Sequence, residues 1–479
     1  MTSTITLPLW AAAALLLFSL LFVLDRLFVP GLRWYLRRKV NRALEEVNTR
    51  LRIRIQPFKL TKRRVLIDRL RYDPAVMEAV ESEMRESGAP RDVVMGRIGR
   101  YAREIVPAFN AYFYFRIGTW LARSVARSLY RVRLGYSDEA KLATIPDRST
   151  IVFVMNHRSN MDYILVSYLA AERTALSYAV GEWARVWPLQ TLIRATGAYF
   201  VRRNSRNPLY RRVLERYVAM ATAGGVTQAV YPEGRLSRDG KLGMAKLGLL
   251  DYMLRSFDPG GDRDIVFVPV GINYDRVLED RSLLLDTGAA APRPGALASA
   301  GRTAAFVLRN LSLIARSKWH RFGYACVNFG PPVSLKEHMR SHNVDFRGME
   351  KERRFEKIGE LAGELMHSIA RVIPVLPVSL VATVFVDNPE DSYSELEMKD
   401  EVVRLMRSLE AGGAHIYVPR GDQDYAISVG LRMLTLRRLL LEENGLFTAR
   451  KSEIQLLRYY ANSVAHLPRA GRPDSSPRL

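Results

Sequence analysis

The sequence predicts an α/β fold, with a central, mostly β-sheet core flanked by helices. Strand-like and helix-like segments alternate from residue 134 to 345, which is typical of a sheet covered by helices. An uncharged apolar run opens the chain, and helical periodicity fills most of the remainder on both sides of the alternating region. We therefore expect these units: a membrane anchor helix at 1–30, a basic helical N-terminal region at 31–133, an α/β domain at 134–345, a helical C-terminal region at 346–467 and a disordered tail at 468–479.

Composition limits the kind of protein. At 479 residues the chain can bury more than one hydrophobic core. It has 72 Lys and Arg against 49 Asp and Glu, giving a formal net charge of +23. Such an excess indicates a polyanionic partner: nucleic acid, an anionic membrane surface or a phosphorylated substrate. The single cysteine, Cys326, excludes an internal disulfide and a Cys-rich metal site.

The N-terminal run favours a membrane. The twenty residues from Ile5 to Leu24 carry no charge, and as a helix they would span about 30 Å, the thickness of a bilayer's hydrocarbon core. A signal peptide would begin with a basic segment, whereas here the Lys and Arg residues follow the run. We therefore expect a retained anchor with the following residues on the cytoplasmic face of the membrane. Fourteen Lys or Arg between Gly31 and Arg71 predict contact with anionic lipid.

A helix is expected from about Val106 to Tyr130. Its arginines form one stripe and its apolar residues another. Two interpretations stay open, a helix at the membrane interface and a helix that packs on the next domain. The arginines are Arg116, Arg123, Arg127 and Arg131.

The alternating region and the C-terminal region yield expected elements from their periodicity. The strands are 150–155, 197–201, 226–230, 265–270 and 323–328, and the helices between them are 162–172, 207–223, 245–256 and 303–317. The C-terminal helices are 350–372, 376–386, 394–409, 427–441 and 451–466.

A histidine and an acid occupy the turn after the first of these strands. His157 precedes Asp162 by five residues, between an apolar strand and the start of a helix. A neutral imidazole takes up a proton near pH 7, and a nearby carboxylate fixes its tautomer and stabilises the imidazolium. The spacing predicts a general base. The simpler alternative is a histidine that caps the helix.

Cations stand on loops that follow other strands, where α/β proteins place functional groups. The loop at 231–241 combines Pro and Gly with three cations and Glu233. Because the forked donors of arginine match phosphate, a base beside these loops suggests deprotonation of a phosphorylated alcohol. The cations are Arg202, Arg203, Arg235, Arg238 and Lys241.

Four blocks, in this order, resemble the glycerol-3-phosphate acyltransferase group of the membrane glycerolipid acyltransferases. They are His157-x4-Asp162, the Gly-aromatic-Arg-Arg block at 197–203, the Glu-Gly block at 233–238 and the Val-Pro block at 268–270. One departure stands out: where that family has Glu-Gly-Gly-Arg-Ser or Glu-Gly-Thr-Arg-Ser, Arg235 comes one residue early. Either Arg235 reaches a phosphate from the shifted position, or Arg238 does so.

The resemblance implies transfer of a fatty acyl group from acyl-CoA or acyl-carrier protein to the sn-1 hydroxyl of glycerol 3-phosphate, the first step of phospholipid synthesis. His157 and Asp162 would be catalytic, and the other residues would bind substrate. We expect no cofactor and no metal. The substrate-binding set is Arg202, Arg203, Glu233, Gly234, Arg235, Ser237, Arg238 and Pro269.

Two alternatives stay open. The acceptor could be dihydroxyacetone phosphate or a lysophospholipid instead. A protein of another class, an inactive basic membrane scaffold or a nucleic-acid-binding protein, would also explain the charge. We expect no nucleic acid partner, because the sequence has no helix-turn-helix, RRM or OB signature. The sequence does not indicate an oligomeric state.

Overall fold

The computed structural model describes residues 55–170, 174–181, 184–185, 187, 189–202, 205–285 and 322–469, together with Pro8 and Ser19. The expected membrane anchor, the helix at 303–317, Arg203 and residues 470–479 of the expected tail lie outside this set. Of the helices that it does describe, none is both long and apolar enough to cross a membrane. The described residues from 55 onward belong to one compact unit.

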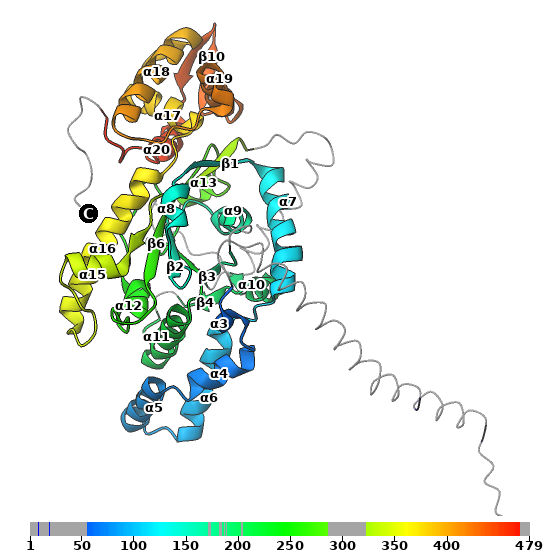
Figure 1. Cartoon of the computed structure of the whole chain (residues 1–479). Coiled ribbons are helices and arrows are strands. Elements are labelled where there is room, and N and C mark those ends of the chain that lie inside the picture. Colours follow the sequence, from blue (N-terminus) through cyan, green and yellow to red (C-terminus); the bar gives the residue numbers. More distant parts are fainter. Residues whose placement is uncertain are drawn as a thin grey trace, which may run out of the picture. The chain divides into compact units, whose positions relative to one another are not determined.

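The predicted α/β core is confirmed. Its described strands form an eight-stranded mixed sheet in the order β1-β7-β6-β2-β5-β3-β4, with β8 also paired to β6 (Figure 1). Strands β2 to β6 are parallel along the ladder, whereas β7 and β8 run antiparallel to β6. The bounds are β1 Arg131–Ser137, β2 Thr150–Met155, β3 Ser177–Gly181, β4 Tyr199–Val201, β5 Gln228–Val230, β6 Ile265–Tyr274, β7 Tyr324–Phe329 and β8 Val333–Ser334.

Strand β6 extends beyond its predicted end because it has different partners along its length. Its first part pairs with β2 as far as Val270, and its last part, from Val270 to Tyr274, pairs with β7. Pro269 lies between the segments paired with β8 and with β7. Since proline lacks an N–H, this gap suits it, and its carbonyl accepts a hydrogen bond of 2.8 Å from the Gly330 N–H. Pro269 is therefore a buried strand residue.

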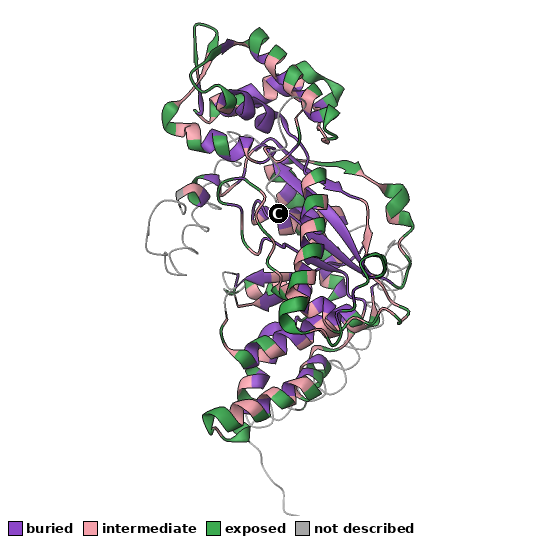
Figure 2. Ribbon diagram, turned by 90° about the vertical axis from the view of Figure 1, so that its left-hand side faces the viewer, coloured by how far each residue is buried: buried purple, intermediate pink, exposed green. Residues whose placement is uncertain are grey.

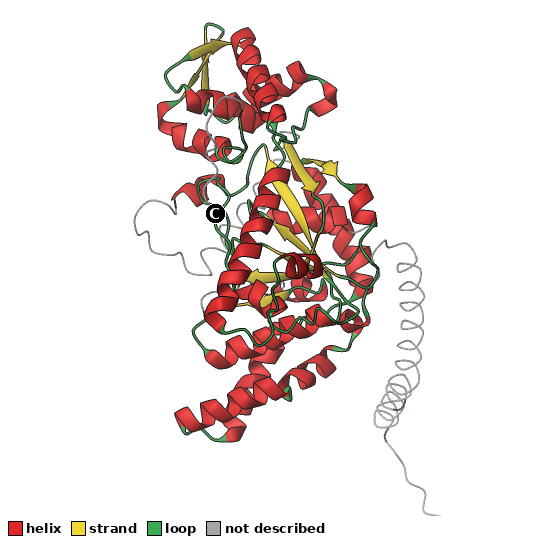
Figure 3. Ribbon diagram, turned by 60° about the vertical axis from the view of Figure 1, so that its left-hand side comes forward, coloured by secondary structure: helices red, strands yellow, loops and turns green. Residues whose placement is uncertain are grey.

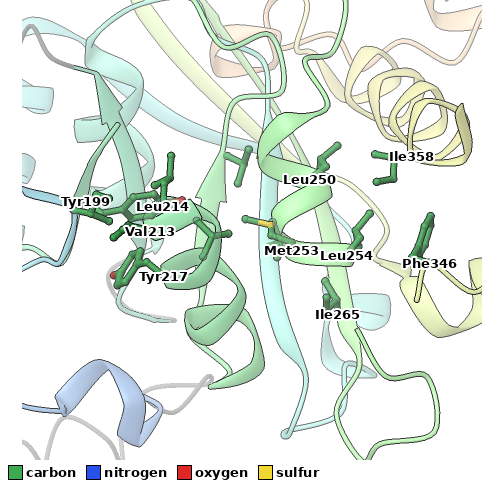
Figure 4. Packing of buried hydrophobic residues seen from close by; sticks show 14 of the residues in the cluster. Tyr199, Val213, Leu214, Tyr217, Leu250, Met253, Leu254, Ile265, Phe346 and Ile358 are labelled. Atoms are coloured by element: carbon green, nitrogen blue, oxygen red, sulfur yellow. The ribbon is translucent and has the colours of Figure 1, made fainter. Parts of the chain in front are cut away.

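Helices cover both sides of the sheet. In Figure 1, α12, α15 and α16 lie on one side and α7, α9 and α10 on the other. Strands β2 and β6 are buried along their whole length (Figure 2). Figure 4 shows Leu250 of α12 pointing toward Ile358 of α16 in the main hydrophobic core. The helices are α3 Pro57–Leu60, α4 Arg63–Arg71, α5 Pro74–Ser87, α6 Arg91–Ile105, π-helix η2 Phe113–Gly118, α7 Thr119–Leu129, α8 Glu139–Ala143, α9 Met161–Ala170, α10 Leu189–Ala195, α11 Pro208–Ala223, α12 Gly248–Leu254, α13 Asp280–Leu285, α15 Leu335–Ser341 and α16 Lys351–Val372.

The helix predicted from Val106 starts later than expected. Residues 106–110 are not helical, because Pro107 disfavours helical geometry at the residue before it. A π-helical turn over Phe113–Gly118 then leads into α7.

The C-terminal region contains helices and a small second sheet, separate from the main sheet in Figure 3. The helix predicted at 427–441 is wrong at its end, since α19 stops at Leu436 and a hairpin follows. The positive φ of 58° at Arg438 ends the helical path there. The elements are α17 Pro377–Asp387, β9 Ser392–Ser394, α18 Glu395–Ala411, η4 Pro419–Gly421, α19 Gln423–Leu436, β10 Leu440–Glu443, β11 Leu446–Ala449, η5 Lys451–Glu453 and α20 Ile454–Ala461.

Candidate active site

The turn from Asn156 to Asp162 is named the His157 turn. It begins with a side-chain amide that hydrogen-bonds to β6 as the backbone of a neighbouring strand would. Asn156 Nδ2 donates to the Ile272 carbonyl at 2.9 Å, and the Ile272 N–H donates to Asn156 Oδ1 at 2.8 Å. The Asn156 side chain thus satisfies the N–H and the carbonyl of Ile272 in β6, beyond the point where β2 ends. The main chain is free to leave the sheet at this point, and His157 follows immediately.

The structure brings His157 and Asp162 together as predicted. Nδ1 of His157 lies 2.9 Å from Oδ2 of Asp162, and the two residues are 2% and 0% exposed. The same Oδ2 accepts the backbone N–H groups of Arg158 at 2.7 Å and Ser159 at 3.0 Å. Because Asp162 takes the hydrogen on Nδ1, the lone pair of the neutral imidazole is on Nε2, the nitrogen that can accept a proton.

Aromatic side chains fix the imidazole further. The Tyr274 hydroxyl donates to Asp162 Oδ1 at 2.6 Å from the β6 extension. Tyr231 stacks on the His157 ring at 4.0 Å, and Tyr163 meets it edge-on at 5.5 Å. Burial raises the pKa values of Tyr274 and Tyr231 well above 10, so both remain neutral at physiological pH. The ring therefore sits in an apolar, oriented environment.

The Glu-Gly block holds the backbone of His157. Glu233 accepts the His157 N–H on Oε1 and the Gly243 N–H on Oε2, each at 2.8 Å. Burial raises the pKa of Glu233, and these two hydrogen bonds oppose the shift. The Ser237 N–H donates to the His157 carbonyl at 2.9 Å, so the block contacts both polar groups of that residue's backbone. Gly234 has φ of +66° and the Lys246 side chain against it, which favours glycine.

Glu279 holds the middle of the turn. Its Oε2 accepts the Ser159 hydroxyl at 2.7 Å, and its Oε1 accepts the Asn160 side-chain amide at 3.0 Å. Burial raises the pKa of this carboxyl. Hydrogen bonds from two consecutive residues give the turn a second support besides Asp162.

Arg158 connects the turn to the C-terminal region. Its guanidinium is buried, donates to the Gly240 carbonyl and lies 4.7 Å from the centre of the Tyr459 ring in α20. Close by, Asn462 Nδ2 donates to the Asp239 carbonyl at 2.8 Å. Nε and Nη2 of Arg158 have no hydrogen-bond partner among the described residues. Helix α20 thus forms part of the wall behind His157.

The predicted cations fall into two groups. Arg202 donates to both carboxylate oxygens of Glu104 in α6, at 2.8 and 2.7 Å, and these bonds raise its pKa. It is therefore held in a bidentate ion pair, and its expected phosphate-binding role stays a prediction. Arg235 and Arg238 are exposed on the loop that carries Glu233. Ser237 turns inward, and its hydroxyl donates to the Lys241 carbonyl at 2.7 Å.

Several supporting residues were not predicted: Asn156, Tyr274, Glu279 and Tyr459. Asn156 directly precedes His157, which was a usable signal. Tyr274 and Glu279 are 112 and 120 residues from their partners, and no local pattern marks them. Within the described part of the chain, one group of three side chains is close enough together that it could hold a metal ion, and none of its members belongs to the His157 turn.

A buried His–Asp pair on the turn after a central strand, in an α/β sheet covered by helices, is the arrangement expected of a His-x4-Asp acyltransferase domain. A family profile described as Acyltransferase matches residues 139–273, and one described as Glycerol-3-phosphate acyltransferase C-terminal region matches residues 308–468. The two matches, the second of them to a region described for glycerol-3-phosphate acyltransferases, confirm the resemblance that the sequence blocks predicted.

Curated relatives that align with most of this chain are named glycerol-3-phosphate acyltransferase. The glycerol-3-phosphate acyltransferase of Pseudomonas aeruginosa (strain PAO1) is 27% identical over 446 residues, covering 89% of this chain and 52% of the relative. That of Alteromonas mediterranea is 26% identical over 427 residues, covering 85% and 50%. The chain thus spans about half the length of the curated relatives it matches. A solved 1-acyl-sn-glycerophosphate acyltransferase from Thermotoga maritima aligns with a TM-score of 0.30 at 18% identity, over 53% of this chain and 78% of that one.

Proposed function

We propose that this protein transfers a fatty acyl group from acyl-CoA or acyl-carrier protein to the sn-1 hydroxyl of glycerol 3-phosphate, giving lysophosphatidic acid. The observation that carries the proposal is the 2.9 Å contact between His157 Nδ1 and Asp162 Oδ2, buried in a chain that resembles this family. The relatives' names indicate the acceptor. The acyl donor and the sn-1 position rest on the resemblance described above.

The chemistry needs one base and no acyl-enzyme. Nε2 of His157 removes the proton from the acceptor hydroxyl as its oxygen attacks the thioester carbonyl carbon. The tetrahedral intermediate collapses, the carbon–sulfur bond breaks, and the thiolate takes the proton from the imidazolium. Asp162 keeps the ring oriented and stabilises its charged form throughout.

The acceptor phosphate is assigned to Arg235 and Arg238. Both lie within two residues of Ser237, whose N–H donates to the His157 carbonyl at 2.9 Å, so their loop is anchored to the backbone of the residue that carries the base. Arginine offers forked, charged donors that suit a phosphate. Arg202 is a weaker candidate because Glu104 already occupies two of its nitrogens. Arg203 remains a prediction from sequence alone.

A membrane surface is the second proposed partner, and residues 112–127 provide the contact. Trp120, Ile117 and Leu121 are 64%, 46% and 44% exposed, one helical turn or less apart. Arg116 and Arg123, one turn before and after Trp120, are exposed as well. An exposed aromatic and apolar face with flanking arginines fits an anionic lipid interface. This favours the interfacial interpretation of the helix.

The acceptor is tested with purified full-length protein in detergent, supplied with acyl-CoA or acylated carrier protein and with each acceptor in turn. We expect the fastest turnover with glycerol 3-phosphate, an ester at the sn-1 position in the product, and turnover by His157→Ala that is at least about a hundredfold slower. Acylation of only a lysophospholipid, or salt-sensitive nucleic acid binding without acyl transfer, would overturn the proposal.

The membrane contact is tested by site-specific labelling, which the buried Cys326 permits. An environment-sensitive fluorophore on Trp120→Cys should brighten and shift to the blue with phosphatidylglycerol vesicles. The matched control is Leu396→Cys, because Leu396 is 78% exposed on α18. Equal responses at both positions would contradict a specific contact through residues 112–127.

A further inference from the structure

Three metal-ligating side chains converge where α15 ends against α16. His338 and His342 are one helical turn apart, and Glu364 faces them from α16. Nδ1 of His338 lies 3.0 Å from one Glu364 oxygen, and Nε2 of His342 lies 3.4 Å from the other. Two donors bound to a tetrahedral Zn²⁺ at about 2.0–2.1 Å lie about 3.3 Å apart. Both spacings are therefore compatible with ligands around one ion, and the ligand atoms of all three residues lie within 4.8 Å of one another.

His342 contacts its neighbours through both ring nitrogens. Its Nδ1 lies 3.0 Å from both the His338 carbonyl oxygen and the Ser341 hydroxyl oxygen, and its Nε2 faces a Glu364 carboxylate oxygen. Since that carboxylate oxygen only accepts, either a ring hydrogen or a metal ion lies between it and Nε2. Metal-bound histidines commonly donate their other N–H to a backbone carbonyl in this way.

Burial and exposure also suit a metal. His338 is 6% exposed, so its ring has little freedom to turn away from Glu364. The side chains of His342 and Glu364 are 43% and 45% exposed, so an ion can reach the site and keep a water as a fourth ligand. Two imidazoles and one carboxylate suit Zn²⁺ rather than Mg²⁺ or Ca²⁺, which prefer oxygen ligands.

We propose that His338, His342 and Glu364 form a zinc site that cross-links α15 to α16. We expected no metal from the sequence, although His338-x3-His342 places two imidazoles on one helical face. The role is structural. Helix α15 follows β8, which pairs with β6 at Val266, whereas the carboxyl end of β2, before His157, pairs with β6 at Val270. The ion would therefore lie toward the opposite end of β6 from the His157 turn.

The test uses full-length, tag-free protein, stripped with a chelator and equilibrated with ZnCl₂. We expect about one Zn²⁺ per chain by elemental analysis and a melting temperature raised by at least about 2 °C. His342→Ala and Glu364→Gln should each weaken Zn²⁺ binding at least about tenfold and lose the thermal shift. Co²⁺ in place of Zn²⁺ should give the visible absorption of a four-coordinate site, absent in His342→Ala.

The matched control is His367→Ala, which removes an exposed histidine of α16 that is not one of the three ligands. This variant should bind Zn²⁺ like wild type, and removal of Zn²⁺ should leave kcat unchanged at 25 °C. Wild-type protein that retains no Zn²⁺, or His342→Ala that binds as tightly as wild type, would overturn the proposal. In either case the group is an ordinary hydrogen-bonded pair with a helix-capping histidine.

Discussion

The hydroxyl of Tyr274 donates a 2.6 Å hydrogen bond to Asp162 on the oxygen that His157 does not use. Both oxygens of this carboxylate are therefore engaged, and the strand β6 reaches the His157 turn from 112 residues away in sequence. Asp162, which orients His157, is thus itself held by a residue of strand β6. Substitutions at Tyr274 should consequently affect catalysis without touching substrate.

Tyr274→Phe is expected to lower kcat about tenfold to a hundredfold, because a hydrogen bond to a charged group contributes about 1.5–3 kcal/mol. The KM values for both substrates should change less than twofold. The pH profile of kcat/KM should also shift, since Asp162 becomes a stronger acceptor for the imidazolium. A drop in melting temperature with unchanged kcat would show that the bond serves stability alone.

The C-terminal region should be required for catalysis through Tyr459. Its ring lies 4.7 Å from the Arg158 guanidinium, while its hydroxyl is buried without a hydrogen-bond partner among the described residues. Tyr459→Phe keeps the ring and should retain wild-type kcat. Tyr459→Leu removes the cation–π contact, worth about 0.5–2 kcal/mol, and should lower kcat about threefold to thirtyfold. Equal activity of the two variants would exclude a positioning role.

Removal of the loop cations should weaken binding of the phosphorylated acceptor. Arg235→Ala and Arg238→Ala together are expected to raise the KM for glycerol 3-phosphate at least about tenfold, given the strength of charge-assisted hydrogen bonds. The KM for the acyl donor should stay within twofold. Arg407→Ala, at an exposed arginine on α18, controls for the loss of one surface charge, and each single loop variant is compared with it. If the acceptor KM is unchanged, the phosphate binds elsewhere.

Stability should depend on pH through Lys59. Burial lowers the pKa of Lys59 to about 7, and its Nζ donates to the Ala175 carbonyl at 2.7 Å. The unfolded chain has a lysine pKa of about 10.4. Between these values the unfolded state binds a proton that the folded state does not, so the free energy of unfolding rises with pH.

Lys59→Met keeps a long apolar side chain at this position and removes the amino group that titrates. The difference in unfolding free energy between wild type and variant should therefore shift in favour of wild type by about 1 kcal/mol per pH unit from pH 7 to 10, and stay flat below pH 7. Chemical denaturation across this range measures it. Parallel pH curves for the two proteins would contradict a neutral buried Lys59.

Local sequence patterns predicted the elements that bury an apolar run or have a helical face. Strand β2 has the bounds expected, 150–155, because all of its residues are buried. Strand β1 was missed, since it is an edge strand whose side chains are largely exposed and include charged residues. Strand β6 was predicted too short because its last residues depend on pairing with β7, more than fifty residues later. Such pairing leaves no local periodicity.

In the candidate active site, too, contacts between residues close in sequence were predicted and contacts between distant residues were not. His157 and Asp162 are close in sequence, so their contact followed from the spacing and the helix start. Arg202 was expected to bind phosphate, but its position at a strand end gives no sign of Glu104, 98 residues earlier. The roles of Glu233 and Ser237 in holding the His157 backbone required the three-dimensional arrangement of two loops.

The most direct test of the central claim is the rate of acyl transfer to glycerol 3-phosphate by His157→Ala, compared with wild type under saturating substrates. The role of His157 Nε2 as general base predicts a loss of at least about a hundredfold, within the range known for acid–base catalysis, with an unchanged melting temperature. A folded His157→Ala protein that keeps more than about a tenth of wild-type kcat would contradict that role.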